Sequence, residues 1–574
     1  MAVDVGRVVR TRGGSSAHQR ALSALAGLVL VALTGGACSG SESDGAADEA
    51  ATTTTSLSTA TADPAAAAPC EPPRNTTPPQ ITPVPESDTD VDVVSFDGTV
   101  IRAHWFPLPG ADASNPAPTV VMGPGWSLSG DTDVDAVGVL GAVDIATLRA
   151  AGYNVLTWDP RGFGRSTGVA QVNSVDFEAR DVQQLLDWVS TLPMVLLDAP
   201  TDPVVGMVGG SYGGGVQLIT AAIDCRVDAL VPVVAWHSLQ TSLFKADTVK
   251  SGWSRTLTDS SAGSAVDPHV TSARDTGLTT GMLSDEDREW FISRGPGDLL
   301  EDVTVPTLIV QGTVDTLFTL DEGVTNYLIL RDNDVPVAMM WYCDGHGVCL
   351  TDPGDVERVK SATVAWLDRY VRDDDNAEPV AGFDIIDQDG VRYTADDYTV
   401  ADGEPLSASG SGTLQLIADG GAGPVAIPPD NTAMLAGLVQ PITPARATNA
   451  VDVDLIVDGG PHLVVGAPQL ELTYTGTVAT GGRPQRVFAQ LVDATTGLVI
   501  GNQITPIQVQ LDGARHTLTT PLEMIAFSAK PGAIITLQLV ATTVAYAQPQ
   551  LGGSITFEAI DLTLPVATDL LQAD

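Results

Sequence analysis

One serine of the chain stands in a motif that is typical of a catalytic nucleophile. The motif Gly-x-Ser-x-Gly spans residues 209–213 with Ser211 at its centre, and it directly follows the apolar run 204–208. A strand that turns sharply into a helix at such a motif strains the serine and lifts its hydroxyl clear of the sheet. Because the motif alone is common by chance, this interpretation also needs a general base and an acid.

The other two members of a triad follow in the order that this type of site requires, first the acid and then the histidine. The apolar run 306–312, bounded by proline and glycine, leads into Asp315, the predicted acid. A second apolar run, 337–342, leads into a glycine-flanked loop that holds His346, the predicted base. Together with Ser211 they predict acyl transfer to water, in which the histidine takes the serine proton and the aspartate stabilises the imidazolium.

Acyl transfer also needs donors for the oxyanion. The residue after the nucleophile supplies one backbone N–H group, here that of Tyr212, just before a predicted helix over 213–222. The other donor comes from the loop after the strand 119–122, where Gly125 and Trp126 are both candidates.

The same residues also have interpretations without a triad. Glycine-rich turns between a strand and a helix occur in phosphate-binding loops, but the chain has no Gly-x-x-x-x-Gly-Lys-Ser/Thr motif. Taken singly, Asp315 fits an ordinary turn, and so does Asp344. A zinc site of Cys343, His346 and Cys349 would have only three ligands and would compete with the triad for the histidine. The sequence therefore predicts neither a metal nor a cofactor.

The segments around these residues predict an α/β fold with a largely parallel sheet. The strand 154–159 enters a turn-rich loop at 160–168, and residues 176–192 have the apolar spacing of a helix. Strands that alternate with helices form parallel sheets that are covered on both faces. Active sites in such sheets lie at the carboxyl ends of the strands, where all three predicted triad residues fall.

These motifs resemble those of the cocaine-esterase and X-Pro dipeptidyl-peptidase group of α/β-hydrolases. The resemblance is carried by Gly-Gly-Ser-Tyr-Gly-Gly at 209–214, by Asp-Pro-Arg-Gly at 159–162 and by a trailing β domain. It implies an α/β-hydrolase core, a helical cap inserted at 239–300 and a C-terminal jelly-roll-like domain. It also implies that the chain cleaves esters or amides, with the same three residues as the triad.

The sequence departs from this group in two places. Some members use a tyrosine hydroxyl after the third strand as an oxyanion donor, whereas this loop begins Gly-Pro-Gly-Trp at residues 123–126. In addition, no set of acidic residues matches one that would grip the free N-terminal amine of a peptide. X-Pro-type peptidase activity is therefore an alternative to esterase or acylase activity.

The composition divides the rest of the chain. Residues 89–376 form the predicted catalytic domain, and the short alternating apolar runs of 377–574 predict an all-β sandwich. We expect this second domain to pack against the first and to shape its cleft. Binding of a carbohydrate or another surface is the alternative.

The N-terminal segment predicts export. Arginines precede an apolar stretch at 21–33 that has the length of a signal peptide and is too short to span a membrane. The predicted signal segment, residues 1–38, ends in a sequence that resembles a bacterial lipoprotein cleavage site, with Cys38 as the acylated residue. Plain cleavage would instead release a secreted enzyme. Residues 39–88 are rich in alanine, threonine, serine and proline, which predicts a disordered tether.

Four cysteines remain when Cys38 is set aside, an even number for an oxidising compartment. Cys343 and Cys349 flank the predicted base closely enough to pair, which leaves Cys70 and Cys225 as a second pair.

The charge of the chain limits its partners. A net charge of −43 and an isoelectric point of about 4.1 exclude a nucleic-acid partner and argue against adsorption to anionic lipid. We therefore expect an exported serine hydrolase, lipid-anchored in the cell envelope or secreted, that acts on a small-molecule or peptide acyl substrate. The alternative of another class is a non-catalytic envelope protein that binds a partner on a hydrolase scaffold.

Overall fold

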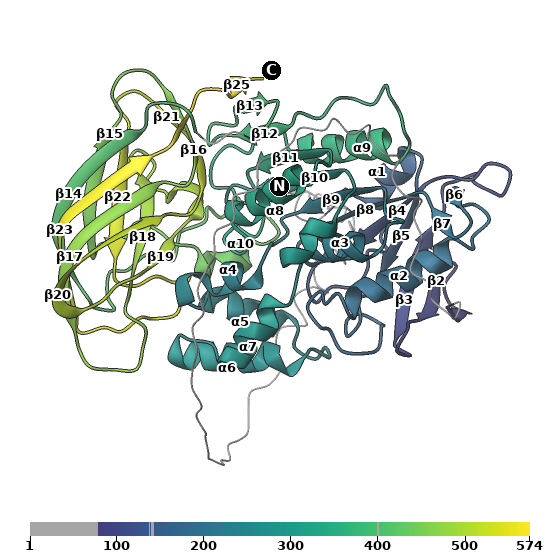
Figure 1. Ribbon diagram of the computed structural model, residues 1–574, viewed down its shortest axis with the longest axis horizontal. Helices are drawn as coiled ribbons and strands as arrows, with labels where there is room; N and C mark the ends of the chain where they lie inside the picture. The colour runs from purple at the N-terminus through teal and green to yellow at the C-terminus, as the bar shows by residue number, and fades with distance from the viewer. Residues whose placement is uncertain (1–78, 137, 139–142, 399–400, 574) are drawn as a thin grey trace, which may run out of the picture. The chain divides into compact units, whose positions relative to one another are not determined.

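The computed structural model describes residues 79–136, 138, 143–398 and 401–573, and a twelve-stranded sheet is its largest element. The order of its strands is β1-β2-β3-β5-β4-β8-β9-β10-β11-β12-β13-β25 (Figure 1). The strands are β1 (Ile81–Pro83), β2 (Asp90–Val94), β3 (Val100–Phe106), β4 (Thr119–Gly123), β5 (Asn154–Trp158), β8 (Val205–Gly210), β9 (Ala229–Val233), β10 (Thr307–Gly312), β11 (Val337–Tyr342), β12 (Phe383–Ile386), β13 (Arg392–Ala395) and β25 (Leu571–Gln572).

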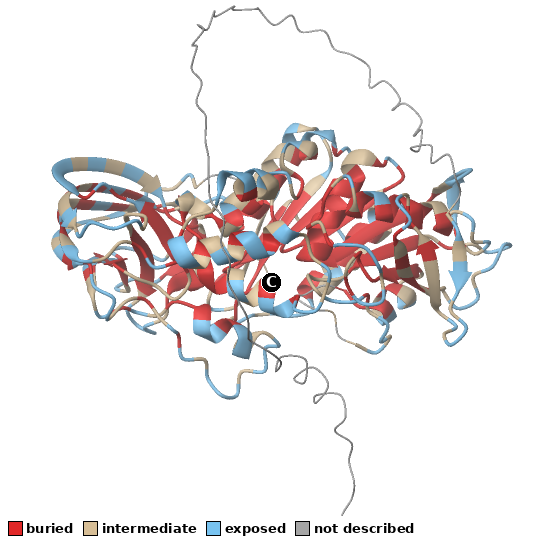
Figure 2. Ribbon diagram, turned by 90° about the horizontal axis from the view of Figure 1, so that it is seen from below, coloured by how far each residue is buried: buried red, intermediate tan, exposed pale blue. Residues whose placement is uncertain are grey.

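The strands from β5 to β12 in this order pair in parallel, and the strands outside them pair antiparallel. Every residue of β4, β5, β8, β9 and β10 is buried, as expected for parallel strands that are covered on both faces. Figure 2 shows buried residues in red along strands inside the molecule and exposed residues in pale blue at its surface.

Two hydrophobic cores lie on opposite faces of the sheet because successive strand residues point to opposite sides. Met207 of β8 packs in one core with α2 (Glu178–Val189), α3 (Tyr212–Ile223) and α8 (Leu320–Asp332). Its neighbour Val208 packs in the other core. That core includes α1 (Ile145–Ala150) and α9 (Arg358–Tyr370).

A helical cap is inserted between β9 and β10. Its elements are α4 (Leu239–Leu243), η2 (Lys245–Asp247), α5 (Ser251–Ser260), α6 (Pro268–Thr280), α7 (Asp285–Ile292) and η3 (Gly297–Asp302). The side chains of Ser238, Asp267 and Ser284 accept hydrogen bonds from the first turns of α4, α6 and α7, and thereby mark where these helices begin.

The C-terminal part forms a β sandwich with its own hydrophobic core. Two four-stranded sheets have the orders β14-β23-β17-β20 and β15-β22-β18-β19, and a three-stranded sheet has the order β21-β16-β24. The strands are β14 (Leu406–Gln415), β15 (Ala450–Ile456), β16 (His462–Gly466), β17 (Gln469–Val478), β18 (Arg486–Asp493), β19 (Thr505–Gln508), β20 (Asp512–Pro521), β21 (Ile525–Ala529), β22 (Ile534–Val540), β23 (Gly553–Leu564) and β24 (Val566–Ala567).

Smaller elements complete the described part of the chain. They are β6 (Leu197–Ala199), β7 (Asp202–Pro203), α10 (Ala436–Val439), η4 (Gln440–Ile442) and η5 (Ile500–Asn502). The fold is thus the α/β-hydrolase core with a helical cap and a C-terminal β sandwich that the sequence predicts.

Two predicted boundaries differ from the structure. Strands β12, β13 and β25 lie in the segment 377–574 assigned to the sandwich, yet they extend the large sheet, because β12 pairs with β11 and buries Phe383 in the catalytic core. Strand β1 lies in the segment 39–88 predicted to be a disordered tether and pairs with β2. Strands β1, β12, β13 and β25 have two to four residues each, too few for a pattern of their own.

The predicted signal segment, its Cys38 and the tether up to residue 78 lie outside the described residues. Among the residues that are described, no helix is long and apolar enough to cross a membrane.

Candidate active site

The turn from β8 into α3 holds Ser211 in a strained backbone conformation. Its φ and ψ are 57° and −114°, a region that residues with a side chain rarely adopt. The Ser211 N–H group donates to the carbonyl of Val233 at 2.8 Å, which ties the turn to β9. Gly213 is required for this approach, because a Cβ atom there would lie 2.1 Å from the carbonyl oxygen of Gly123.

The three residues predicted as a triad form one hydrogen-bonded chain. Nε2 of His346 lies 2.8 Å from Oγ of Ser211, and its Nδ1 lies 2.7 Å from Oδ2 of Asp315. Asp315 is fully buried, and the other two side chains are nearly so. This burial protects the hydrogen bonds from competition with water.

The carboxylate of Asp315 is held by the backbone of its own loop. Its Oδ1 accepts from the N–H groups of Leu317 and Phe318, each at 2.8 Å, and its Oδ2 also accepts from the N–H of His346 at 3.0 Å. These bonds set the orientation in which the carboxylate meets the imidazole. Asp344 makes no such contact with His346 among the hydrogen bonds of the described residues, and burial raises the pKa of its carboxyl to about 6.

The cap supplies a buried lysine to the same loop. Nζ of Lys250 donates to the carbonyl of Thr316 at 3.0 Å and to that of Leu317 at 2.9 Å. Burial lowers the pKa of this ammonium. The indole of Trp253 donates to Oγ1 of Thr316 at 3.0 Å, so the cap holds the loop through two side chains.

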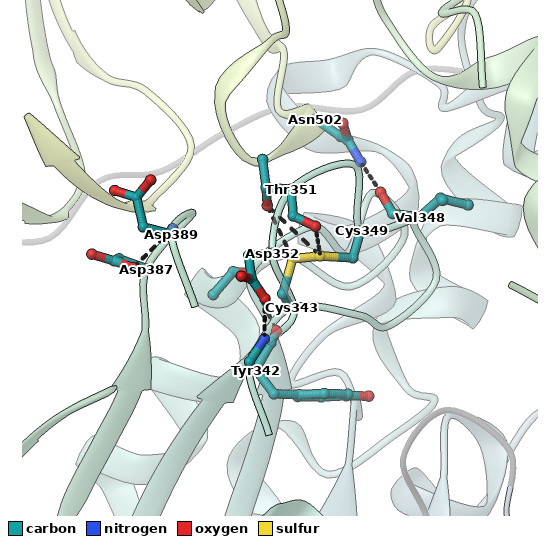
Figure 3. The surroundings of a disulfide bond; sticks show 11 residues. Tyr342, Cys343, Val348, Cys349, Thr351, Asp352, Asp387, Asp389 and Asn502 are labelled. Carbon is teal, nitrogen blue, oxygen red and sulfur yellow. Dashed lines mark hydrogen bonds between the residues drawn. A yellow bond between two sulfur atoms is a disulfide. The ribbon is translucent and has the colours of Figure 1, made fainter. Parts of the chain in front are cut away.

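The β sandwich holds the acid and base loops through two adjacent side chains. Nε2 of Gln503 donates to the backbone carbonyl of Asp315 at 2.8 Å. Nδ2 of Asn502 donates to the carbonyl of Val348, two residues after the base, at 3.0 Å (Figure 3). No sequence motif surrounds Lys250, Asn502 or Gln503, so the sequence did not indicate these contacts.

A disulfide closes the loop that carries His346. Cys343 and Cys349 are bonded, as predicted, and Figure 3 shows the bond at the end of β11. Cys225 is also disulfide-bonded, whereas Cys70, its predicted partner, lies outside the described residues. The described residues contain no cluster of three or more histidine, cysteine or acidic side chains suited to a metal.

Two of the predicted oxyanion residues, Tyr212 and Trp126, line the same pocket as Ser211. Tyr212 is the first residue of α3, where a backbone N–H group has no acceptor within the helix. The ring centroids of Trp126 and Tyr212 lie 5.3 Å apart. The indole N–H of Trp126 donates to the carbonyl of Leu257 on α5 at 2.9 Å. The carbonyl of Gly125 accepts from the N–H of Leu128 and closes a turn. The assignment of Gly125 or Trp126 as second donor stays a prediction.

A pocket opens beside Ser211 under the cap. Its wall combines Trp126 and Tyr212 with Leu317 and Phe318 of the acid loop and with side chains from α4 to α7. Most of these side chains are apolar. The arrangement places a hydroxyl, a base and an apolar cavity together, as acyl transfer to water requires.

One family model matches part of the chain. Residues 97–346 match the model of the family described as X-Pro dipeptidyl-peptidase (S15 family), a match that ends at the predicted base. No curated protein matches the chain. The family match confirms the resemblance seen in the motifs and identifies the chain as a hydrolase.

Solved structures share the fold, including three that align with most of this chain. A CocE/NonD family hydrolase from Staphylococcus aureus has a TM-score of 0.61 and 11% identity, over 83% of this chain and 93% of its own. An aminopeptidase from a marine sediment Thaumarchaeota archaeon has a TM-score of 0.60 and 13% identity, over 86% of this chain and 99% of its own. An alpha-amino acid ester hydrolase has a TM-score of 0.61 and 12% identity, over 87% of this chain and 100% of its own.

Proposed function

We propose that this hydrolase of the X-Pro dipeptidyl-peptidase and cocaine-esterase group cleaves an ester or amide bond through a triad of Ser211, His346 and Asp315. The observation that carries the proposal is the continuous hydrogen-bonded chain from Oγ of Ser211 to the buried carboxylate of Asp315. It begins at a strained turn between a strand and a helix, beside an apolar pocket.

In this mechanism Oγ of Ser211 attacks the carbonyl carbon of the substrate while Nε2 of His346 takes its proton. Asp315 accepts from Nδ1–H, which fixes the tautomer and stabilises the imidazolium. The oxyanion is held by the N–H of Tyr212 and by a donor at Gly125 or Trp126. The imidazolium then protonates the departing alcohol or amine, and an acyl-enzyme remains.

Water completes the reaction. His346 takes a proton from a water molecule, whose oxygen attacks the acyl carbon. Collapse of the second tetrahedral intermediate releases the carboxylic acid and returns the proton to Ser211. The cycle needs no cofactor or metal in this scheme.

We also propose that the enzyme is exported and lipid-anchored at Cys38. The signal-like segment 1–38 supports export, and the disulfide between Cys343 and Cys349 fits an oxidising compartment. Mass spectrometry of the mature N-terminus tests this proposal. An acylated Cys38 is expected, whereas a free terminus after residue 37 would indicate a secreted enzyme.

X-Pro-type peptidase activity is a second candidate because the matching family model carries that name. A chromogenic X-Pro dipeptide substrate with a free amine tests it directly, since release of the reporter group requires recognition of both residues.

Labelling with a fluorophosphonate probe tests the triad without a known substrate, since the probe reacts only with an activated serine. We expect labelling that maps to Ser211 and is absent in Ser211→Ala. Ser254→Ala, which changes another serine of the same pocket wall, serves as the control and should still label at Ser211. Absence of labelling in folded wild-type protein would favour the non-catalytic envelope protein.

A further inference from the structure

The charges on the wall of the Ser211 pocket are all positive. Two arginines line it, Arg274 of α6 and Arg288 of α7, and among the residues that the structure describes no aspartate or glutamate does. Each arginine pairs with an aspartate of its own helix, Arg274 with Asp275 at 2.7 Å and Arg288 with Asp285 at 2.8 Å. Neither aspartate lines the pocket.

The acidic side chain of Glu178, beside Tyr212, is already engaged. Glu178 lies behind Tyr212, where its Oε1 accepts from the N–H of Gln171 at 2.6 Å and from the tyrosine hydroxyl at 3.2 Å. Its Oε2 accepts from the N–H of Ser174 at 2.8 Å. Burial raises the pKa of this carboxyl to about 7. Both oxygens thus face protein donors, and a substrate amine would find no free carboxylate here.

An ammonium group in this pocket would be poorly tolerated. It would lose its hydration among apolar side chains such as Leu243, Leu257 and Val270, with no carboxylate to replace the water. Burial of an uncharged apolar group in the same pocket is favourable and stabilises the bound substrate.

From this wall we infer that the acyl group of the substrate is apolar and uncharged, so that the enzyme hydrolyses esters or amides of simple apolar carboxylic acids and rejects α-amino acyl substrates. This inference rests on the proposed function. It separates the chain from enzymes that act on α-amino acids or on peptides with a free N-terminus.

A pair of methyl esters tests the inference. Methyl 3-phenylpropanoate and L-phenylalanine methyl ester share a carbon skeleton and differ in the α-amino group. At pH 6, where that amine is charged, we expect kcat/KM to be at least about 100-fold higher for the uncharged ester. The electron-withdrawing ammonium makes the charged ester more reactive in solution, so this result would arise from the enzyme.

Substitution of one polar wall residue sharpens the test. Ser254 of α5 lines the pocket, and Ser254→Asp places a carboxylate there. We expect this variant to raise kcat/KM for the charged ester at least about 10-fold. Ser254→Asn, of nearly equal size but without charge, should not. The rate of fluorophosphonate labelling at Ser211 reports whether each variant keeps its site.

The outcomes separate this inference from the proposed function. Labelling of Ser211 with equal or faster hydrolysis of the charged ester would overturn the inference alone. Labelling with hydrolysis of neither ester would also overturn it, because the pocket would then not accept a simple apolar acyl group. Absence of labelling would instead remove the proposed function.

Discussion

The nucleophile and its two partners are held in place by different kinds of structure. Ser211 is positioned by β8, α3 and neighbouring strands of the core, with glycines where backbones touch. The loops of Asp315 and His346 are positioned by side chains from outside the core, namely Lys250 of the cap and Asn502 and Gln503 of the β sandwich.

This difference assigns a role to the added parts of the molecule. The core alone builds the turn of the serine, whereas the acid and base loops receive further hydrogen bonds from the cap and the sandwich. A sandwich that hydrogen-bonds to the carbonyl of Asp315 is part of the support of the site. Variants that affect one half of the site and leave the other intact test this comparison.

The largest loss of Ser211 labelling is expected from a substitution in the turn that holds the serine. In Gly213→Ala the new Cβ would lie 2.1 Å from the carbonyl oxygen of Gly123, and that backbone cannot move without displacing β4. We expect labelling of Ser211 to slow by at least about 100-fold. Gly437→Ala in α10 is the control, since a Cβ atom there has no heavy atom within 4 Å. An equal loss in both variants would contradict the argument.

The second effect concerns the cap. Lys250→Met leaves the buried carbonyls of Thr316 and Leu317 without their donor, so we expect labelling of Ser211 to slow about 10- to 100-fold. Lys245→Met removes a neighbouring lysine that pairs with Asp321 and Glu523 instead. Its effect should appear in thermal stability more than in the labelling rate. Equal labelling rates in the two variants would mean that Lys250 is only structural.

The third effect concerns the sandwich. Gln503→Leu removes one hydrogen bond to the Asp315 carbonyl, and we expect labelling to slow about 3- to 10-fold. Gln508→Leu is the matched control, because this glutamine of the same domain contacts Ala246 and Asp247 of the cap, away from the acid loop. A wild-type rate in Gln503→Leu would show that the sandwich does not support the site.

The smallest effect on activity is expected at the disulfide. Cys343→Ser combined with Cys349→Ser should lower the free energy of unfolding by about 2 kcal/mol, because the loop gains entropy when unfolded. Labelling should slow less than in Gln503→Leu, since Asn502 and Asp315 still bind the loop. Denaturant unfolding measures the change in the free energy of unfolding. A reductant should leave the labelling rate of this variant unchanged, and a further loss would implicate Cys225.

Much of the fold was predictable because its signals are local. The buried strands appear in the sequence as apolar runs, and the turn at Ser211 appears as a serine between glycines. The acid and the base each stand in a loop that directly follows such an apolar run. The structure places His346 within hydrogen-bonding distance of both Ser211 and Asp315. The boundaries were less predictable, because β1, β12 and β25 are too short to show a pattern.

The sequence by itself determined the elements and the residue types of the site, since strand and helix periodicity and the strained turn depend on neighbouring residues. Only the tertiary structure decided which distant side chains hold the site: Gln503 lies 188 positions from Asp315, and Asn502 lies 154 positions from Val348. It also decided that the charges on the pocket wall are arginines. No local spacing encodes these contacts, because they arise only when the cap and the sandwich pack against the core.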